Sequence, residues 1–203
     1  MTRSLRGRDL LIASGNAGKL AEFAALLTPF GTRVLSLKDM GLGEPEETEF
    51  TFAGNARLKA RAACLASGVP ALADDSGLTV AALGGWPGIY TADWAETGAG
   101  RDFDRAMQKV WHMLQAVDAE PPYMAAFHCV LALSWPDGED IVFSGQLSGQ
   151  IVWPKRGVLG HGYDPIFQPD GYGQTMGELA IGEKNLISHR AVAVQKFAAH
   201  CFT

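Results

Sequence analysis

The chain has 203 residues, 47% of them hydrophobic, which is enough for one globular domain or for two closely joined lobes. Its 22 acidic and 17 basic residues give a formal net charge of -5, so the overall charge does not favour binding to a nucleic acid or an anionic membrane. No segment approaches membrane-spanning length, and the apolar run Leu10–Ala13 is too short for a signal-peptide core. These features predict a cytoplasmic protein in which any phosphate-binding cations are clustered locally.

The three cysteines, Cys64, Cys129 and Cys201, are far apart and each has apolar sequence neighbours. Their odd number and the lack of any Cys-x-x-Cys spacing argue against a disulfide framework and against a structural zinc site. We expect three buried, reduced thiols that act as small hydrophobic side chains.

The N-terminal region predicts a strand, a polar loop, a helix and a second strand. Asp9–Ala13 is a short apolar run typical of a buried strand, and the glycine-containing loop Ser14–Lys19 follows it. Apolar residues then repeat at helical spacing over Leu20–Leu27. Arg33–Leu37 has the composition of a second strand.

An acidic loop and a second helix come next. The loop is predicted over Gly41–Glu49, and the helix over Thr51–Ser67 with Thr51 as its N-cap. The apolar run Val69–Leu72 predicts a third strand, and Asp74 and Asp75 follow at its end.

The second half begins with the glycine-rich segment Gly84–Gly100, predicted as a long loop, and continues with an amphipathic helix over Phe103–Val117. Ala119–Pro122 resembles a linker, and two strands are predicted over Met124–Trp135 and Asp140–Trp153. Gly157–Pro169 is predicted to be irregular, and Ser188–Cys201 is predicted to be a final helix. The order of these elements predicts a mixed α/β fold, with two lobes around a sheet.

Adjacent acids at the end of a buried strand are the first candidates for chemistry. Asp74 and Asp75 would repel each other in a low-dielectric setting unless a cation, a donor or a metal offsets them, which is typical of a metal or proton-transfer site. The alternative is that Asp74–Gly77 is only a turn, because Asp, Ser and Gly all favour turns.

The loop Ser14–Lys19 is the candidate phosphate site. It combines backbone N–H groups, a helix N-terminus and an ammonium within a few residues. It is not a Walker P-loop, because Ala13 and Leu20 stand where that motif needs Gly and Ser or Thr. An Asn-Gly turn with a solvated lysine remains the alternative.

The acidic loop and the second helix offer further groups. One of Glu46, Glu47 and Glu49 could complete a metal site with the Asp pair, since Mg²⁺ prefers a few carboxylates plus substrate phosphates. Asn55 and Lys59 are four residues apart and share a helix face, so Lys59 could reach a phosphate or a neighbouring carboxylate. A surface lysine is the simpler alternative.

The C-terminal region carries a third polar group of residues. Gly160–Pro165 contains two ring side chains and an acid, and Lys184, His189 and Arg190 follow it. Rings can stack on a base, and cations can bind a phosphate or an exocyclic oxygen of the base. His189 and Arg190 could equally decorate an ordinary helix.

Together these segments resemble the Ham1/RdgB family of noncanonical purine nucleoside triphosphate pyrophosphatases, and the resemblance spans nearly the full chain. Several separate motifs in the same order make it specific. The segments that carry it are Ser14–Lys19, Phe52–Ala60, Ala73–Leu78, Gly84–Tyr90, Gly162–Phe167 and Glu183–Arg190.

The resemblance implies hydrolysis of the α–β phosphoanhydride of ITP, dITP or XTP, with Mg²⁺, by a homodimer. It also implies an elongated mixed β-sheet flanked by helices, with two lobes around it and a nucleotide cleft between the lobes. The chain is expected to form one domain over 1–203. Its two lobes are expected at approximately 1–120 plus 170–203 and at 121–169. No nucleic acid and no membrane is expected as a partner.

The family pattern also implies roles for residues of this sequence. Asp75 is the expected general base and, with Glu47, the expected metal ligand. The residues expected to bind the substrate are Ser14, Gly15, Asn16, Ala17, Gly18, Lys19, Lys59, Ser76, His161, Gly162, Tyr163, Asp164, Lys184, His189 and Arg190.

Two positions depart from the family pattern. His161 stands where the family usually has Phe, and Gly54 stands where it often has Glu. These departures leave open a purine-nucleotide sensor that binds without catalysis. A related pyrophosphatase for modified pyrimidine triphosphates is a further alternative.

Overall fold

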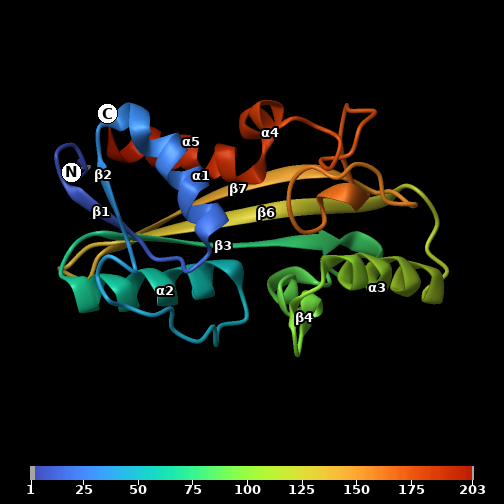
Figure 1. Ribbon diagram of the computed structural model, residues 1–203, viewed down its shortest axis with the longest axis horizontal. Coiled ribbons are helices and arrows are strands. Elements are labelled where there is room, and N and C mark those ends of the chain that lie inside the picture. The colour runs from blue at the N-terminus through green and yellow to red at the C-terminus, as the bar shows by residue number, and fades with distance from the viewer. Residues whose placement is uncertain (1–2, 203) are drawn as a thin grey trace. The chain divides into compact units, whose positions relative to one another are not determined.

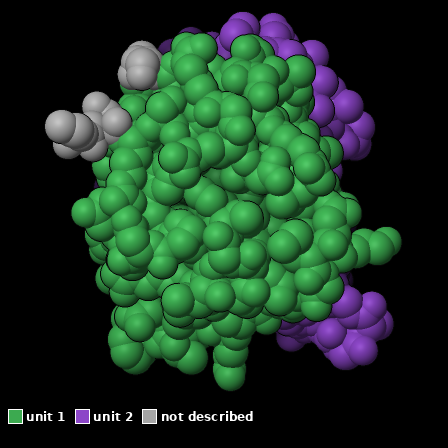
Figure 2. All heavy atoms as spheres, turned by 90° about the vertical axis from the view of Figure 1, so that its left-hand side faces the viewer, with its two compact units in different colours: residues 1–75, 129–145, 190–203 green, residues 76–128, 146–189 purple. Residues whose placement is uncertain are grey.

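The structure is a computed structural model, and it describes residues 3–202. The chain divides into two compact units, coloured separately in Figure 2. The first comprises the described residues up to Asp75 together with 129–145 and the residues from Arg190 onward; the second comprises 76–128 and 146–189. Three long strands each contribute residues to both units.

A six-stranded mixed sheet has the strand order β2-β1-β3-β6-β7-β8. Strand β1 pairs in parallel with β2 and with β3, whereas β8 is antiparallel to β7. The bounds are β1 Asp9–Ile12, β2 Arg33–Ser36, β3 Ala71–Val80, β6 Tyr123–Ser134, β7 Asp140–Ile151 and β8 Phe167–Pro169. The sheet confirms the mixed α/β prediction.

In the first unit, helices α1 (Ala17–Leu27) and α5 (His189–Cys201, all but its first residue) lie on one side of the strands, and α2 (Phe52–Ser67) lies on the other (Figure 1). Side chains that alternate along a strand point to opposite faces. Ile12 and Leu72 accordingly belong to a core cluster with α1 and α5, whereas Leu11 and Ala73 belong to a cluster with α2. This alternation decides where the polar residues of β3 point.

The Asp pair does not end a strand. Strand β3 runs without interruption through Asp74, Asp75 and Ser76, so both the turn interpretation and the predicted strand end are wrong. Pairing with β1 stops at Ile12 and Leu72, and the two acids therefore lie past the end of β1, where the loop Ser14–Lys19 begins. The strand continues because nearby cations and amides stabilise both carboxylates, as described below.

The second unit contains α3 (Phe103–Ala116), α4 (Ile181–Ile187) and the β4–β5 ribbon (Glu96–Thr97, Gly100–Arg101). Its core is one cluster that includes Val110 of α3, Phe127 of β6 and Phe167 of β8. The predicted long loop holds the short ribbon and three-residue 3-10 helices. Helix α4 and strand β8 are too short for the sequence pattern to reveal, and the latter lies within the stretch predicted as irregular.

The helix ends follow the predicted signals. Thr51 caps α2 by accepting a hydrogen bond from the Gly54 N–H, and Gly68 ends this helix in the left-handed conformation. All three cysteines are free and buried, as expected. No helix within residues 3–202 is long and apolar enough to cross a membrane.

Candidate active site

Asp74 and Asp75 point to opposite faces of β3, because neighbouring side chains of a strand alternate. Asp74 shares the face of Leu72, toward α1 and α5, and Asp75 shares the face of Ala73, toward α2. The two acids therefore have different partners, instead of the shared site that adjacent acids suggest.

Asp74 is held between two cations. Its carboxylate lies 2.8 Å from Lys19 Nζ at the start of α1 and 3.5 Å from the Arg190 guanidinium in α5. Burial alone would raise the pKa of Asp74, but the charges of Lys19, Arg190 and Lys59 outweigh it and hold that pKa well below the usual range. Asp74 is thus ionised at any ordinary pH and orients two side chains that can bind phosphate.

Asp75 has a different electrostatic environment. Its carboxylate accepts a hydrogen bond of 3.2 Å from the Asn55 amide and lies 3.8 Å from Lys59 Nζ. Burial, helped by the charge of Glu47, raises the pKa of Asp75 to about 6, although Lys59 and Asn55 partly counteract this. A carboxylate with a pKa in this range is suited to accept a proton near neutral pH.

Asp75→Asn is expected to stabilise the metal-free protein at pH 7 by about 2 to 3 kcal/mol, because the raised pKa means that ionised Asp75 costs folding free energy. Well below pH 4 this carboxyl is protonated in both the folded and the unfolded state, so the gain should vanish there, grow between about pH 4 and about pH 6, and level off above. Urea denaturation of both proteins across this range measures it. A gain independent of pH would contradict the prediction.

Lys59 bridges Asp75 and the acidic loop from the buried face of α2. Its ammonium lies 2.5 Å from Glu47 Oε1 and is itself buried. Burial lowers the pKa of Lys59, but Asp75, Asp74 and Glu47 together raise it above the usual value, so the cation is retained. Lys59 therefore contacts a carboxylate, one of the two partners expected for it, and is not a surface lysine.

Glu47 and Asp75 are the residues suited to hold a divalent cation. Two oxygen-donor side chains face one ammonium, and Mg²⁺ is commonly held by one or two carboxylates together with substrate phosphates. Within residues 3–202, no group of three or more His, Cys, Asp and Glu side chains could hold a metal by itself. The donor set fits a cation that arrives with a phosphorylated ligand.

The loop between β1 and α1 is built around Asn16. Its side chain accepts hydrogen bonds from the N–H groups of Gly18 and Lys19 at 2.9 and 3.1 Å, which makes it the N-cap of α1. The Ser14 hydroxyl accepts from the Asn16 N–H. The lysine of this loop is paired with Asp74, so the alternative of a turn with a solvated lysine does not describe it.

The remaining predicted residues belong to the second unit. The Asp164 carboxylate accepts hydrogen bonds from Lys184 Nζ and from the His161 N–H, both at 3.0 Å, while the His161 side chain is exposed. Tyr163 is 1% exposed, its hydroxyl donates to the Thr91 carbonyl, and its ring packs edge-on against Phe103.

Two other expected ligands, His189 and Ser76, also lie in this unit. The His189 ring stacks on Phe127 with centroids 5.1 Å apart. Ser76 directly follows Asp75 on β3 and is partly exposed. The exposed His161 ring is available for stacking, and the Tyr163 ring is used in the core.

Gly160 is required by the Asp164–Lys184 pair. It has a φ of +91°, and a Cβ there would lie 2.0 Å from both Asp164 Oδ2 and Lys184 Nζ. Ala is strained at this φ, and the ends of the Asp164 and Lys184 side chains would have to move, so Gly160→Ala is expected to lower the free energy of unfolding by about 1 to 2 kcal/mol. Urea denaturation measures this, with Gly171→Ala as the control, since Gly171 has a similar φ of +81° and nothing within 4 Å of its Cβ position. Equal losses in the two variants would show that the ion pair plays no part.

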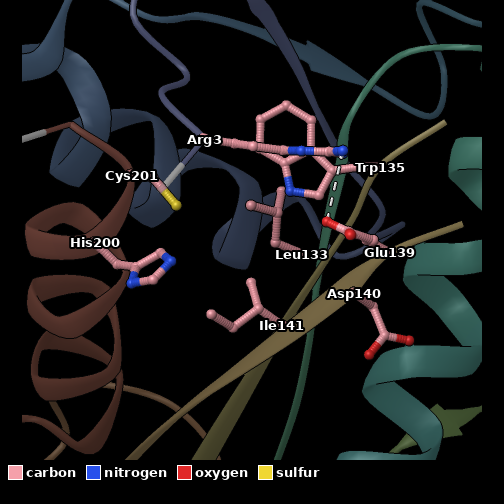
Figure 3. A pocket seen from close by; sticks show the side chains of 8 residues that line it. All are labelled: Arg3, Leu133, Trp135, Glu139, Asp140, Ile141, His200 and Cys201. Carbon is pink, nitrogen blue, oxygen red and sulfur yellow. Dashed lines mark ion pairs between the residues drawn. The ribbon is translucent and has the colours of Figure 1, made fainter. Parts of the chain in front are cut away.

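Asn55 was not predicted as a site residue, although it contacts Asp75 directly. The sequence did carry the signal, since Asn55 and Lys59 share one face of α2. A separate pocket of the first unit is lined by none of the predicted residues (Figure 3). Its lining includes Arg3 on the Trp135 ring and Asp140, which pairs with Arg57 and Arg61 of α2.

Known proteins similar to this chain match it over almost its whole length. A protein named dITP/XTP pyrophosphatase from Ruegeria pomeroyi is 57% identical over 202 residues, which cover 100% of this chain and 99% of the relative. One of the same name from Brucella melitensis is 53% identical, with 97% and 94% covered.

Among solved structures, a HAM1 protein from Coxiella burnetii has a TM-score of 0.88 and 38% sequence identity, over 94% of this chain and 96% of that one. A Ham1 protein from Staphylococcus aureus has a TM-score of 0.84 and 36% identity, over 95% and 97%. Residues 10–200 also match the family model described as the Ham1 family. With a match over almost its whole length, this chain belongs to the Ham1 family.

Proposed function

We propose that the protein hydrolyses noncanonical purine nucleoside triphosphates (ITP, dITP and XTP) to the monophosphate and pyrophosphate, and so cleanses the nucleotide pool. The observation that carries this proposal is that the two acids of β3 have different environments. Asp74 contacts two cations, and the raised pKa of Asp75 suits it to accept a proton. The names of the relatives, dITP/XTP pyrophosphatase, point to the same substrates.

The phosphates bind to the loop Ser14–Lys19 and to nearby cations. Lys19 and Arg190 already face one anion, Asp74, and an ammonium and a guanidinium are both suited to phosphate oxygens. The N-terminus of α1 adds a favourable dipole for an anion. Lys59 keeps its charge in a buried position and so contributes to the same neutralisation.

Mg²⁺, held by Glu47 and Asp75, would supply charge neutralisation to the phosphates and align them for attack. Asp75 acts as the general base that takes a proton from the water attacking the α-phosphorus. Asn55 and Lys59 fix the position of this carboxylate. Pyrophosphate is then the leaving group.

The purine base of the nucleotide is recognised by residues of the second unit. Selecting hypoxanthine or xanthine over adenine needs donors directed at a 6-keto oxygen, because a 6-amino group would leave buried donors unpaired. His161, Lys184 and His189 are the residues proposed for this role, with Asp164 holding Lys184 and the His161 backbone in place. His161, which stands where the family usually has Phe, is also proposed to stack on the purine ring.

A substrate panel tests the proposal against its rivals. Pyrophosphate release with Mg²⁺ is measured for ITP, dITP, XTP, dUTP and ATP. The proposal predicts rates on ITP, dITP and XTP at least about 100-fold above those on dUTP and ATP, as expected for a mispaired polar group in a buried site. Binding of ITP without pyrophosphate release would favour the sensor, and preference for dUTP would favour the pyrimidine enzyme.

We also propose that the protein is a cytoplasmic homodimer. Sedimentation equilibrium of the full chain tests the assembly: a mass near twice 21.7 kDa supports the dimer, and a mass near 21.7 kDa at micromolar concentration contradicts it.

A further inference from the structure

We propose that Asn55 is a positioning residue that fixes the acidic loop and the Asp75 carboxylate to the same point of α2. The inference deepens the proposed function and rests on it, since the loop carries Glu47 and Asp75 is the proposed base. It concerns a residue that contributes no group to the phosphates or the metal.

The side chain of Asn55 makes two hydrogen bonds in opposite directions. Its Oδ1 accepts from the Glu49 N–H at 3.0 Å, and its Nδ2 donates to Asp75 Oδ2 at 3.2 Å. Asn55 is 2% exposed, so water does not compete for either bond. One amide therefore joins the backbone of the loop, two residues from Glu47, to the carboxylate on β3.

An uncharged amide serves both partners at this position, because it offers a donor and an acceptor on one side chain. The loop offers an N–H donor and needs an acceptor, whereas the carboxylate needs a donor. An Asp at position 55 retains the acceptor for Glu49 but turns a second carboxylate toward Asp75. A Leu of similar size offers neither bond, so the two substitutions separate the two functions of this side chain.

Gly54 lets the loop approach the helix closely enough for these bonds. A Cβ on Gly54 would lie 2.6 Å from Glu49 Cβ and 3.0 Å from Glu49 Cγ. Glu49 thus lies directly against the first turn of α2, with its Cβ near Gly54 and its N–H bonded to Asn55. The absence of a side chain at position 54 and the amide at 55 act together on one residue of the loop.

Lys59 forms a second bridge one turn further along α2. It connects the Glu47 side chain to Asp75 through its ammonium, as Asn55 connects the Glu49 backbone to the same acid. The Glu47 side chain is 41% exposed, so this ion pair alone is a weak restraint on the loop. The buried amide bridge is therefore the restraint that keeps Glu47 and Asp75 in a fixed position relative to each other.

The test compares Asn55→Leu and Asn55→Asp with wild type by two readouts. The first is hydrogen exchange of the Glu49 amide, followed by NMR in metal-free protein without substrate. The second is steady-state hydrolysis of dITP at saturating Mg²⁺. Arg57→Ala is the matched control, because Arg57 is on the same helix but pairs with Asp140.

Asn55→Leu is expected to speed exchange of the Glu49 amide by at least about tenfold, because its acceptor is lost. Asn55→Asp is expected to leave that exchange within about threefold of wild type. Both should lower kcat at least about tenfold with KM changed less than about threefold, since misplacing the base affects the chemical step. Arg57→Ala should change neither readout.

Wild-type exchange in folded Asn55→Leu, or wild-type kcat in Asn55→Asp, would overturn the proposal. If Asn55→Leu does not fold, as judged by circular dichroism, Asn55→Asp decides by itself: retained protection at Glu49 with lowered kcat supports the proposal, and any other combination rejects it. Because the exchange experiment uses no substrate, it still tests the bridge if wild-type protein releases no pyrophosphate from dITP, a result that would reject the proposed function instead.

Discussion

Asp75→Asn is expected to lower kcat for pyrophosphate release from dITP about 1,000-fold, within the range for loss of a positioned general base. The substitution keeps the shape of the side chain and an acceptor oxygen, but it removes the proton acceptor and one metal ligand. Binding of dITP should change far less, because Lys19 and Arg190 hold their positions through Asp74. Stopped-time assays of pyrophosphate and equilibrium binding measure the two effects.

The matched control for this loss is Asp104→Asn, which removes an exposed carboxylate paired with Lys155 in the second unit. It should retain wild-type turnover. A kcat for Asp75→Asn within about tenfold of wild type would remove Asp75 from the role of base. The raised pKa of Asp75 would then be only a consequence of its burial and would no longer indicate a catalytic role.

Asp74→Asn is expected to lower the free energy of unfolding at pH 7 by about 3 kcal/mol, because it leaves Lys19 and Arg190 without their shared counter-ion. This change in the free energy of unfolding has the opposite sign to the change expected for Asp75→Asn, which stabilises the metal-free protein. The folded-state pKa of Asp74 is lowered, so its contribution is complete above about pH 4 and is lost as the pH falls through that lowered value.

Urea denaturation at pH 7 and at about pH 3 measures the effect, with Asp75→Asn as the control that differs by one position on the same strand. The loss in Asp74→Asn should shrink at the lower pH, because there the Asp74 carboxyl is protonated in the unfolded wild-type chain while it stays ionised in the folded protein, which lowers its contribution to stability. Equal stability of Asp74→Asn and wild type at pH 7 would contradict the assignment of Asp74 as the counter-ion of two cations.

Most helices and strands of this fold could be predicted from the sequence because their signals are local. Thr51 and Gly68 mark the ends of α2, and the Phe103–Val117 periodicity predicts α3. The segment around Asp74 could not be predicted in this way. Its residues have turn propensity, but the partners that keep it in a strand, Lys19 and Arg190, are distant in sequence.

The sequence could predict which residues form the candidate site, but it could not predict how they are arranged in space. Motif resemblance identified Asp75, Lys59 and Glu47, which the structure brings together on the α2 side of the sheet. It could not show that Asp74 faces the other way, since that depends on β3 continuing through the acids so that their side chains alternate. Asn55 was not predicted because its role depends on its two hydrogen-bond partners, the Glu49 N–H and the Asp75 carboxylate, which only the folded chain brings together.

Hydrolysis of dITP in ¹⁸O-labelled water tests the central claim most directly, namely that Asp75 activates water for attack on the α-phosphorus. Mass spectrometry of the products should find one ¹⁸O atom in dIMP and none in pyrophosphate, with both products lost in Asp75→Asn. Label in pyrophosphate, or release of dIDP and orthophosphate, would place the attack at another phosphorus and contradict the account.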